Sequence, residues 1–190
     1  MVTSQAAGEI GELYVFQELL RLGVSVYVPL VDEGVDALAR TPGGQTMELQ
    51  IKSAGGAGGK HPRWFQMSRF DPRKEFFIIA VETLDGKPGD VWVFPSAVFD
   101  AYASRPPKGA PRDLDLDGGS RKYGMALKDL LCGFRNCWDL LVHFERYEAL
   151  LESPEVLEDI LTMREAIEAP EQESLSLEEY ERHRSAGLSH

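Results

Sequence analysis

Four polar side chains in the first third of the chain combine residue types that could act together on a phosphate group. Asp36 stands in one short segment, and Glu48, Gln50 and Lys52 alternate with apolar residues in the next. Because alternate side chains of a strand share a face, the acid, the amide and the ammonium of the second segment project together. Such a row costs free energy inside a fold unless the side chains serve a ligand or a reaction. The pattern therefore predicts a polar site.

The chemistry that suits these side chains is phosphodiester hydrolysis. A hard divalent cation, Mg²⁺ or Mn²⁺, prefers oxygen ligands, which Asp36, Gln50 and a nearby main-chain carbonyl could supply, with Glu48 as a further acid. The metal would polarise a phosphoryl oxygen and acidify bound water. Lys52 could orient that water and stabilise the charge that develops on the phosphate. The alternative is structural: Asp36 would be a turn carboxylate, and Gln50 and Lys52 solvated residues on an edge strand.

The elements around these residues are expected to bring them together. Up to residue 53 they are a helix over 4–22 and strands over 24–28, 34–40 and 45–53. Ser4 is the expected N-cap of the helix and Gly23 ends it. A Pro/Gly turn joins the last two strands into a hairpin. Asp36 would then lie on the strand next to Gln50 and Lys52, so that the three side chains converge.

The rest of the chain continues with strands and helices. The expected elements are strands over 76–83 and 91–94, a helix over 97–103 capped by Ser96, an amphipathic helix over 138–151, and loops over 54–60 and 104–120. Ser153-Pro154-Glu155 is typical of the start of a further helix. We therefore expect an α/β fold with a core domain over 1–137 and a helical, acidic C-terminal extension over 138–190.

Several of these features occur in the same order in a known superfamily. Gly8-Glu9-Ile10-Gly11-Glu12 lies in the first helix, Gly23 follows it, and an acid after Gly34-Val35 precedes Gln-x-Lys at 50–52. Residues 8–94 thereby resemble the PD-(D/E)xK, or restriction-endonuclease-like, nucleases. Within that superfamily they look most like the group of Holliday-junction resolvases and Mrr-type restriction enzymes. The resemblance implies a mixed sheet with flanking helices.

The resemblance also implies an activity and a site. It assigns catalytic roles to Glu12, Asp36, Gln50 and Lys52 in an Mg²⁺-dependent endonuclease that hydrolyses DNA, in defence or repair. The second acid of the motif is replaced by Gln50, which weakens metal binding, and Glu48 on the same face could compensate. The alternative is therefore a catalytically weak or inactive nuclease-fold module that binds DNA or a protein partner.

Charge is divided unevenly along the chain. The net charge of −11 opposes nucleic-acid binding, but residues 1–140 hold 16 Lys and Arg against 18 Asp and Glu, whereas residues 141–190 hold 4 against 13. Within the first part, residues 52–74 hold six basic residues and one acidic residue. Aromatic residues between these cations suit stacking on bases. The expected nucleic-acid-binding residues are Lys60, Arg63, Trp64, Arg69 and Arg73; the alternative is an ordinary solvated face.

Further expectations concern location and assembly. No apolar run approaches the roughly 18 residues of a membrane helix, and the first residues lack the pattern of a signal peptide, so we expect a cytoplasmic protein without a membrane segment. Cys132 and Cys137 are expected to be reduced thiols rather than zinc ligands. The apolar stripes of the helices over 138–168 favour a homodimer through these C-terminal helices, and autoinhibition by the acidic tail is the alternative.

Overall fold

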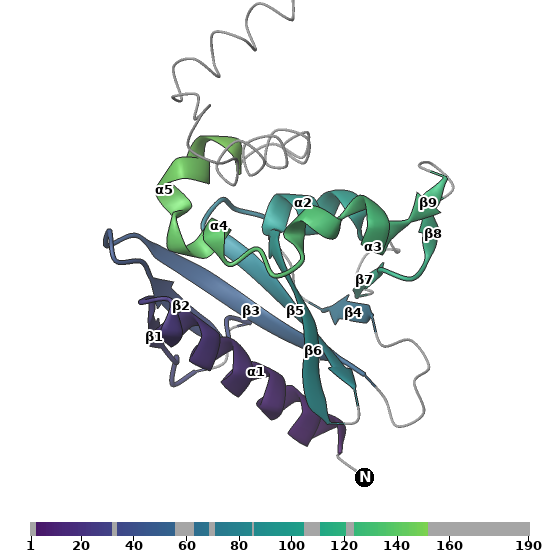
Figure 1. Ribbon diagram of the computed structural model, residues 1–190, viewed down its shortest axis with the longest axis horizontal. Coiled ribbons are helices and arrows are strands. Elements are labelled where there is room, and N and C mark those ends of the chain that lie inside the picture. Colours follow the sequence, from purple (N-terminus) through teal and green to yellow (C-terminus); the bar gives the residue numbers. More distant parts are fainter. Residues whose placement is uncertain are drawn as a thin grey trace, which may run out of the picture. The chain divides into compact units, whose positions relative to one another are not determined.

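A five-stranded mixed sheet forms the centre of the protein in the computed structural model (Figure 1). The structure describes residues 3–31, 34–55, 63–68, 71–84, 86–104, 111–120 and 124–151. These residues belong to one compact unit, residues 1–154, and a second unit, residues 155–190, lies outside the described residues. In the described part of the chain, no helix is long and apolar enough to cross a membrane.

The helices and strands are long in the first half of the chain and short in the second. In chain order they are α1 (Ser4–Arg21), β1 (Ser25–Tyr27), β2 (Ala37–Arg40), β3 (Thr46–Ala54), β4 (Trp64–Met67), β5 (Phe76–Leu84), β6 (Lys87–Pro95), α2 (Ser96–Tyr102), β7 (Arg112–Asp115), β8 (Gly119–Ser120), β9 (Met125–Ala126), α3 (Leu127–Leu130), the 3-10 helix η1 (Cys132–Phe134), α4 (Asp139–Val142), α5 (Phe144–Tyr147) and the 3-10 helix η2 (Glu148–Leu150). In Figure 1, α1 runs along the lower side of the view, and α2 to α5 gather at the upper side.

The sheet combines a hairpin at its start with one parallel pair at its centre. The strand order is β1-β2-β3-β5-β6. β3 and β5 are parallel, and the other neighbouring pairs are antiparallel. β4 pairs with β7 in a separate two-stranded sheet, as β8 does with β9. A mixed sheet with helices around it confirms the α/β fold class that the sequence predicts.

Helix α1 packs closely on the sheet through a glycine. A Cβ atom at Gly11 would lie 2.0 Å from Ser53 Oγ and 3.6 Å from Val81 Cβ, so a side chain there would separate the helix from β3 and β5. The helix covers the range that its apolar spacing predicts. Its N-cap differs from the prediction, because Thr3 is the N-cap and its Oγ1 accepts a hydrogen bond from the Ala6 amide at 3.2 Å.

The last described segment differs from the single helix predicted over 138–151. His143 has φ −117° and ψ 41°, outside the helical region, and divides the segment into α4 and α5. Five of its large apolar residues are buried all the same, and Trp138 and Leu150 are half-buried; the five are Leu140, Leu141, Phe144, Tyr147 and Leu151. The ring of Phe144 meets that of Phe77 on β5 edge-on, with centroids 6.1 Å apart. Residues 138–151, which the sequence places in the extension, thus pack as part of the first compact unit.

Two smaller predictions are wrong. Residues 104–120 are not one loop, because β7 pairs along β4 from Trp64↔Asp115 to Met67↔Arg112 and β8 follows. Ser96 does not cap α2 with its side chain. Its hydroxyl instead donates to the Arg73 carbonyl at 2.6 Å and accepts from the Arg73 amide at 2.9 Å. Ser96 therefore ties the start of α2 to the segment that leads into β5.

Candidate nuclease site

Asp36 is held against β3 by main-chain hydrogen bonds. The chain enters this position through Gly34, whose φ of +89° lies in the left-handed region that favours glycine. The Asp36 amide donates to the Leu49 carbonyl at 2.9 Å, and Asp36 Oδ2 accepts from the Ile51 amide at 2.6 Å. The carboxylate therefore has a fixed place beside the middle of β3.

Gln50 and Lys52 are linked to each other on β3. Gln50 is buried, with 9% of its surface exposed. The orientation of its amide that satisfies both ends has Nε2 donating to the Gly34 carbonyl at 3.0 Å and Oε1 accepting from Lys52 Nζ at 3.0 Å. The amide thus connects the segment before Asp36 to the ammonium of Lys52, and the hairpin brings together the three residues that the sequence predicts to converge.

Glu12 contributes a second carboxylate from α1. Burial raises the pKa of Glu12 most, and the negative charge of Asp36 raises it further, whereas the Lys52 ammonium lowers it and Glu9 adds a small increase. These influences require Asp36 and Lys52 to lie within electrostatic range of the Glu12 carboxyl. The structure therefore brings all four predicted catalytic residues, Glu12, Asp36, Gln50 and Lys52, into one region.

Two carboxylates of this region suit a hard cation, and the third oxygen donor, Gln50 Oε1, already has a partner. Repulsion between the Glu12 and Asp36 carboxylates is what a bound divalent ion would relieve. Gln50 Oε1 is a possible third donor, but it accepts from Lys52 and would have to exchange that bond. Among the described residues, no three His, Cys, Asp or Glu side chains are grouped closely enough to hold a metal by themselves. Two carboxylates fit Mg²⁺ or Mn²⁺, with further oxygens coming from outside this set.

Glu48, the additional predicted metal ligand, is engaged elsewhere. Its carboxylate forms an ion pair with Arg73, whose guanidinium also lies 4.6 Å from the centroid of the Phe76 ring. Glu48 is four residues from Lys52, which corresponds to about 13 Å along a strand. Along β3, Glu48 and Lys52 lie on opposite sides of Gln50. The carboxylate of Glu48 is directed to a cation of the segment before β5.

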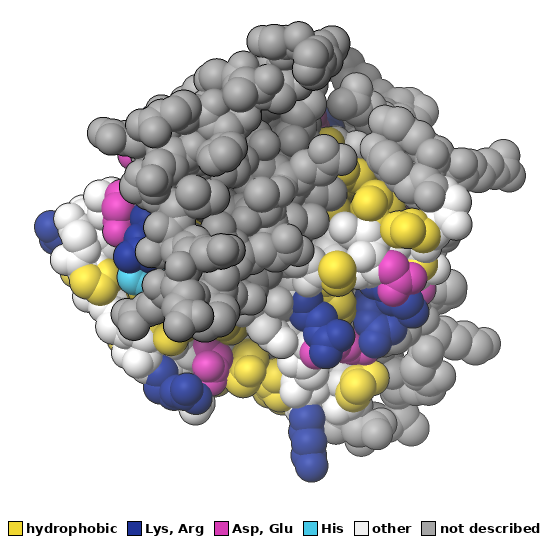
Figure 2. Space-filling model, turned by 45° about the horizontal axis from the view of Figure 1, so that its top comes forward, with side chains coloured by type: hydrophobic (Ala, Val, Ile, Leu, Met, Phe, Trp, Pro, Cys, Tyr) yellow, Lys and Arg dark blue, Asp and Glu magenta, His cyan; other side chains and the backbone are white. Residues whose placement is uncertain are grey.

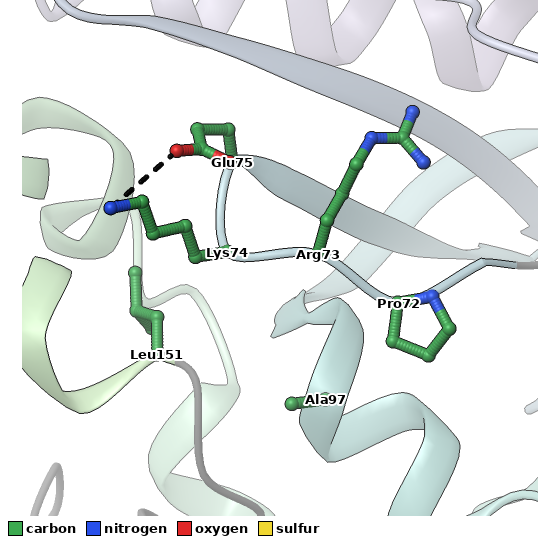
Figure 3. Close-up of a pocket in the computed structure, with 6 residues that line it drawn as sticks. All are labelled: Pro72, Arg73, Lys74, Glu75, Ala97 and Leu151. Carbon is green, nitrogen blue, oxygen red and sulfur yellow. Dashed lines mark ion pairs between the residues drawn. The ribbon is translucent and has the colours of Figure 1, made fainter.

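A pocket of about 380 Å³ lies beside this ion pair and apart from the candidate site (Figure 3). It is lined by Pro72, Arg73, Lys74, Glu75, Ala97 and Leu151. Arg73 points away from Lys74, which pairs with Glu75 at 3.8 Å and with Glu148 at 2.9 Å. The pocket thus adjoins cations that already have acidic partners.

The described cations among the predicted nucleic-acid-binding residues have acidic partners. Arg63 pairs with Glu82 and with Asp117, each at 3.1 Å, and Trp64 is 47% exposed on β4. Arg73 pairs with Glu48. Lys60 and Arg69 lie outside the described residues. On the face in view, Figure 2 shows a group of Lys and Arg side chains with Asp or Glu side chains beside it.

The partners of Arg63 are functional candidates that the sequence did not single out. Asp117 also binds Lys128, with Nζ 3.1 Å from Oδ1. The sequence contained a signal for Glu82, because this acid directly follows the apolar run of residues 76–81. The structure shows that it is buried. Asp117 and Lys128 had none, since Asp117 stands in an acidic turn and Lys128 in a short helix that no periodicity marks.

Comparison with known proteins supports the fold only. No protein-family model matches the sequence. No curated protein matches it either. Among solved structures, the bacterial homing endonuclease I-Ssp6803I is similar, with a TM-score of 0.53 and 19% sequence identity over 75% of this chain and 94% of that chain. At that identity the likeness concerns the fold, and it shows that residues of this chain build an architecture also found in a nuclease.

Proposed function

We propose that this protein is a metal-dependent endonuclease that hydrolyses phosphodiester bonds of DNA at Glu12, Asp36, Gln50 and Lys52. The observation that carries the proposal is that these side chains, from α1, from the segment before β2 and from β3, come together in the structure. The fold shared with a homing endonuclease supports it. The PD-(D/E)xK assignment rests on the order of these residues in the sequence.

Each residue has a separate part in this proposal. Asp36 and Glu12 would hold Mg²⁺ or Mn²⁺, with Gln50 as a further oxygen donor. When bound, such an ion polarises a phosphoryl oxygen and lowers the pKa of its water. Lys52 binds the phosphate and stabilises the charge that develops there, and Gln50 Oε1 holds the ammonium in place until the substrate arrives.

The ionisation of Glu12 sets the pH at which the site becomes competent. Burial and the charge of Asp36 raise the pKa of Glu12, so a larger share of its carboxyl is protonated in mildly acid solution than for an exposed glutamate. A protonated carboxyl is a poor metal ligand. Metal binding should therefore strengthen as the pH rises through the Glu12 pKa.

The test is cleavage of supercoiled plasmid DNA with Mg²⁺ or Mn²⁺, and with EDTA as the blank. We expect D36N, K52M and E12Q each to reduce the rate by about 100-fold or more, as the loss of an electrostatic contact to the reacting phosphate does. Matched controls are E9Q on the same helix and K87M on β6, both exposed positions, which should keep the rate. Equal rates for wild type, D36N and K52M would refute the site.

A non-catalytic DNA-binding module is the second candidate, and Gln50 is the observation that favours it. An amide replaces a carboxylate at a position where both of its ends already have partners in the protein. The variant Q50E separates the two functions. If Gln50 is a metal ligand, the added charge should tighten Mg²⁺ binding in calorimetry and raise the cleavage rate. Weaker Mg²⁺ binding by Q50E, together with DNA binding but no cleavage by wild type, would favour the binding module.

A further inference from the structure

Two cations hold one carboxylate at the edge of the small β4–β7 sheet. Arg63 Nη1 donates to Asp117 Oδ1 at 3.1 Å and to Oδ2 at 3.4 Å, and Lys128 Nζ donates to Oδ1 at 3.1 Å. A guanidinium and an ammonium around one set of anionic oxygens is also the arrangement by which proteins bind a phosphate group. Asp117 therefore stands where a phosphate oxygen could stand.

Glu82 keeps Arg63 in place independently of Asp117. Its side chain is 3% exposed and lies 3.1 Å from Nη2, the terminal nitrogen of Arg63 that makes no contact with Asp117. A buried carboxylate needs a cationic partner, so the pair of Glu82 and Arg63 should persist whatever happens at Asp117. The guanidinium is thus positioned before any ligand binds.

The outer side of the cluster is open to solvent. The side chains of Arg63, Asp117 and Lys128 are 25%, 32% and 41% exposed. Burial by itself would raise the pKa of Asp117, but the hydrogen bond and charge of Lys128 and the charge of Arg63 outweigh it and lower that pKa. Asp117 is therefore fully charged at neutral pH and competes with any other anion for the two cations.

The cluster lies on the same side of the sheet as Lys52. The parallel register pairs Lys52 with Ala80 and Ala54 with Glu82, and alternate residues of a strand share a face. The Cα atoms of Lys52 and Glu82 are consequently about 8 Å apart. Each strand of DNA carries one charge per roughly 3.4 Å of helix axis, so a strand at Lys52 has further phosphates within reach of Arg63.

We propose that Arg63 and Lys128 form a binding site for a backbone phosphate of DNA, and that Asp117 occupies this site as an internal substitute until the phosphate displaces it. The identity of the ligand rests on the proposed function, because DNA is the substrate there. The substitution exchanges one anion for another between the same two cations, and Glu82 supplies the fixed support. Asp117 accordingly lowers the affinity of the protein for DNA.

The test removes the internal anion and measures binding without cleavage. D117N should bind a DNA duplex about 5- to 10-fold more tightly than wild type at low salt, in EDTA, as expected for one charge-assisted contact. The plot of log affinity against log salt should be steeper by about one, the contribution of one neutralised phosphate. The matched control is D113N, which removes the same charge from β7 at a residue bonded to Gln66 and not to Arg63. Equal affinities for D117N and D113N would overturn the proposal.

Two further arms complete the test. In a K128Q background, D117N should give no gain, and a full gain there would exclude Lys128 from the site. Thermal unfolding checks that D117N folds. Should it fail to fold, K128Q alone must still weaken DNA binding and reduce the salt slope.

Inorganic phosphate at constant ionic strength separates the sources of the anion, because tight phosphate binding by D117N without any gain for DNA would refute a nucleic-acid ligand. Since EDTA prevents cleavage, an inactive but DNA-binding wild type would refute the proposed catalysis and leave this inference standing.

Discussion

Glu12 is a residue of the candidate site whose pKa its surroundings raise. Burial and Asp36 disfavour its charged form, and Lys52 compensates in part. Carboxylates with a raised pKa are common at sites that bind a cation or transfer a proton. Gln50 Oε1 gives the Lys52 ammonium a neutral hydrogen-bond partner at 3.0 Å. The site thus contains one carboxylate that favours an added positive charge and one ammonium that remains available to an anion.

The raised pKa of Glu12 predicts how stability changes with pH. The folded state binds the Glu12 proton more tightly than the unfolded state, so its contribution to stability is greatest below the ordinary glutamate pKa of about 4.3 and declines as the pH rises through the folded pKa. Replacing Glu12 by glutamine removes this penalty. E12Q should therefore unfold at a higher temperature than wild type at pH 7, and the difference should shrink towards pH 4.

Thermal unfolding followed by circular dichroism across this pH range measures the effect. E9Q is the control, since Glu9 is exposed on the same helix and accepts a hydrogen bond from Gln5. Addition of Mg²⁺ should raise the unfolding temperature of wild type more than that of E12Q, because a ligand stabilises the state that binds it. An E12Q protein that is less stable than wild type at pH 7 would contradict the assigned direction.

At the scale of elements, the contact between α1 and β3 determines where Glu12 lies. Gly11 allows the helix to approach Ser53, and Glu12 follows it in the next position. Ser53 Oγ is buried and has no hydrogen-bond partner among the described residues. The close approach therefore also leaves a polar atom unsatisfied, which costs stability. The same close approach places Glu12 near Asp36 and Lys52.

A pair of substitutions tests this contact. G11A should destabilise the protein by about 1–3 kcal/mol, because the added methyl overlaps Ser53 Oγ and must push the helix away. S53A should be neutral or stabilising, and G11A/S53A should recover much of the loss. Urea unfolding measures all three. G8A is the control in the same helix, where a Cβ meets nothing within 4 Å, and it should stabilise by about 0.5–1 kcal/mol. A G11A protein as stable as G8A would show that the helix is not held this closely.

At the scale of the whole molecule, acidity is concentrated in the last part of the sequence. Residues 155–190, the second unit, hold 10 Asp and Glu against 3 Lys and Arg, which leaves the first unit much closer to neutral. In the first unit, acidic partners hold Arg63, Arg73 and Lys74. Five large apolar residues of 138–151, a segment on which the predicted homodimer partly depends, are buried in their own chain. The homodimer through the C-terminal helices stays a prediction.

This charge distribution predicts the effect of removing the second unit. A chain of residues 1–154 should bind DNA more tightly than the full chain at low salt, because a strongly acidic segment lowers the concentration of phosphates near the protein. The difference should fade as salt rises from about 50 to 200 mM and the Debye length shortens. Fluorescence anisotropy with labelled duplex measures it, and thermal unfolding serves as the control for folding of the shorter chain. A difference that persists unchanged in high salt would point to a specific contact instead of long-range repulsion.

The sequence by itself determined the local parts of the candidate site. The alternation from Glu48 to Lys52 reflects the period of a strand, and the turn before it is a property of proline and glycine, so hairpin and shared face follow from short-range rules. The same rules placed Asp36 next to β3 in the hairpin; in the structure it directly precedes Ala37, which pairs with Leu49. Helix α1 was visible for the same reason, because its apolar spacing extends over five turns.

Tertiary structure alone decided which charged groups meet. Arg63 and Asp117 are 54 residues apart and Glu48 and Arg73 are 25 apart, and nothing in their local sequence distinguishes a paired cation from a free one. The parallel pairing of β3 with β5 brings Glu82 to the side of Lys52, and the pairing of β4 with β7 brings Asp117 to Arg63. Periodicity reports which face a side chain occupies, whereas its partners depend on long-range packing that places distant segments in contact.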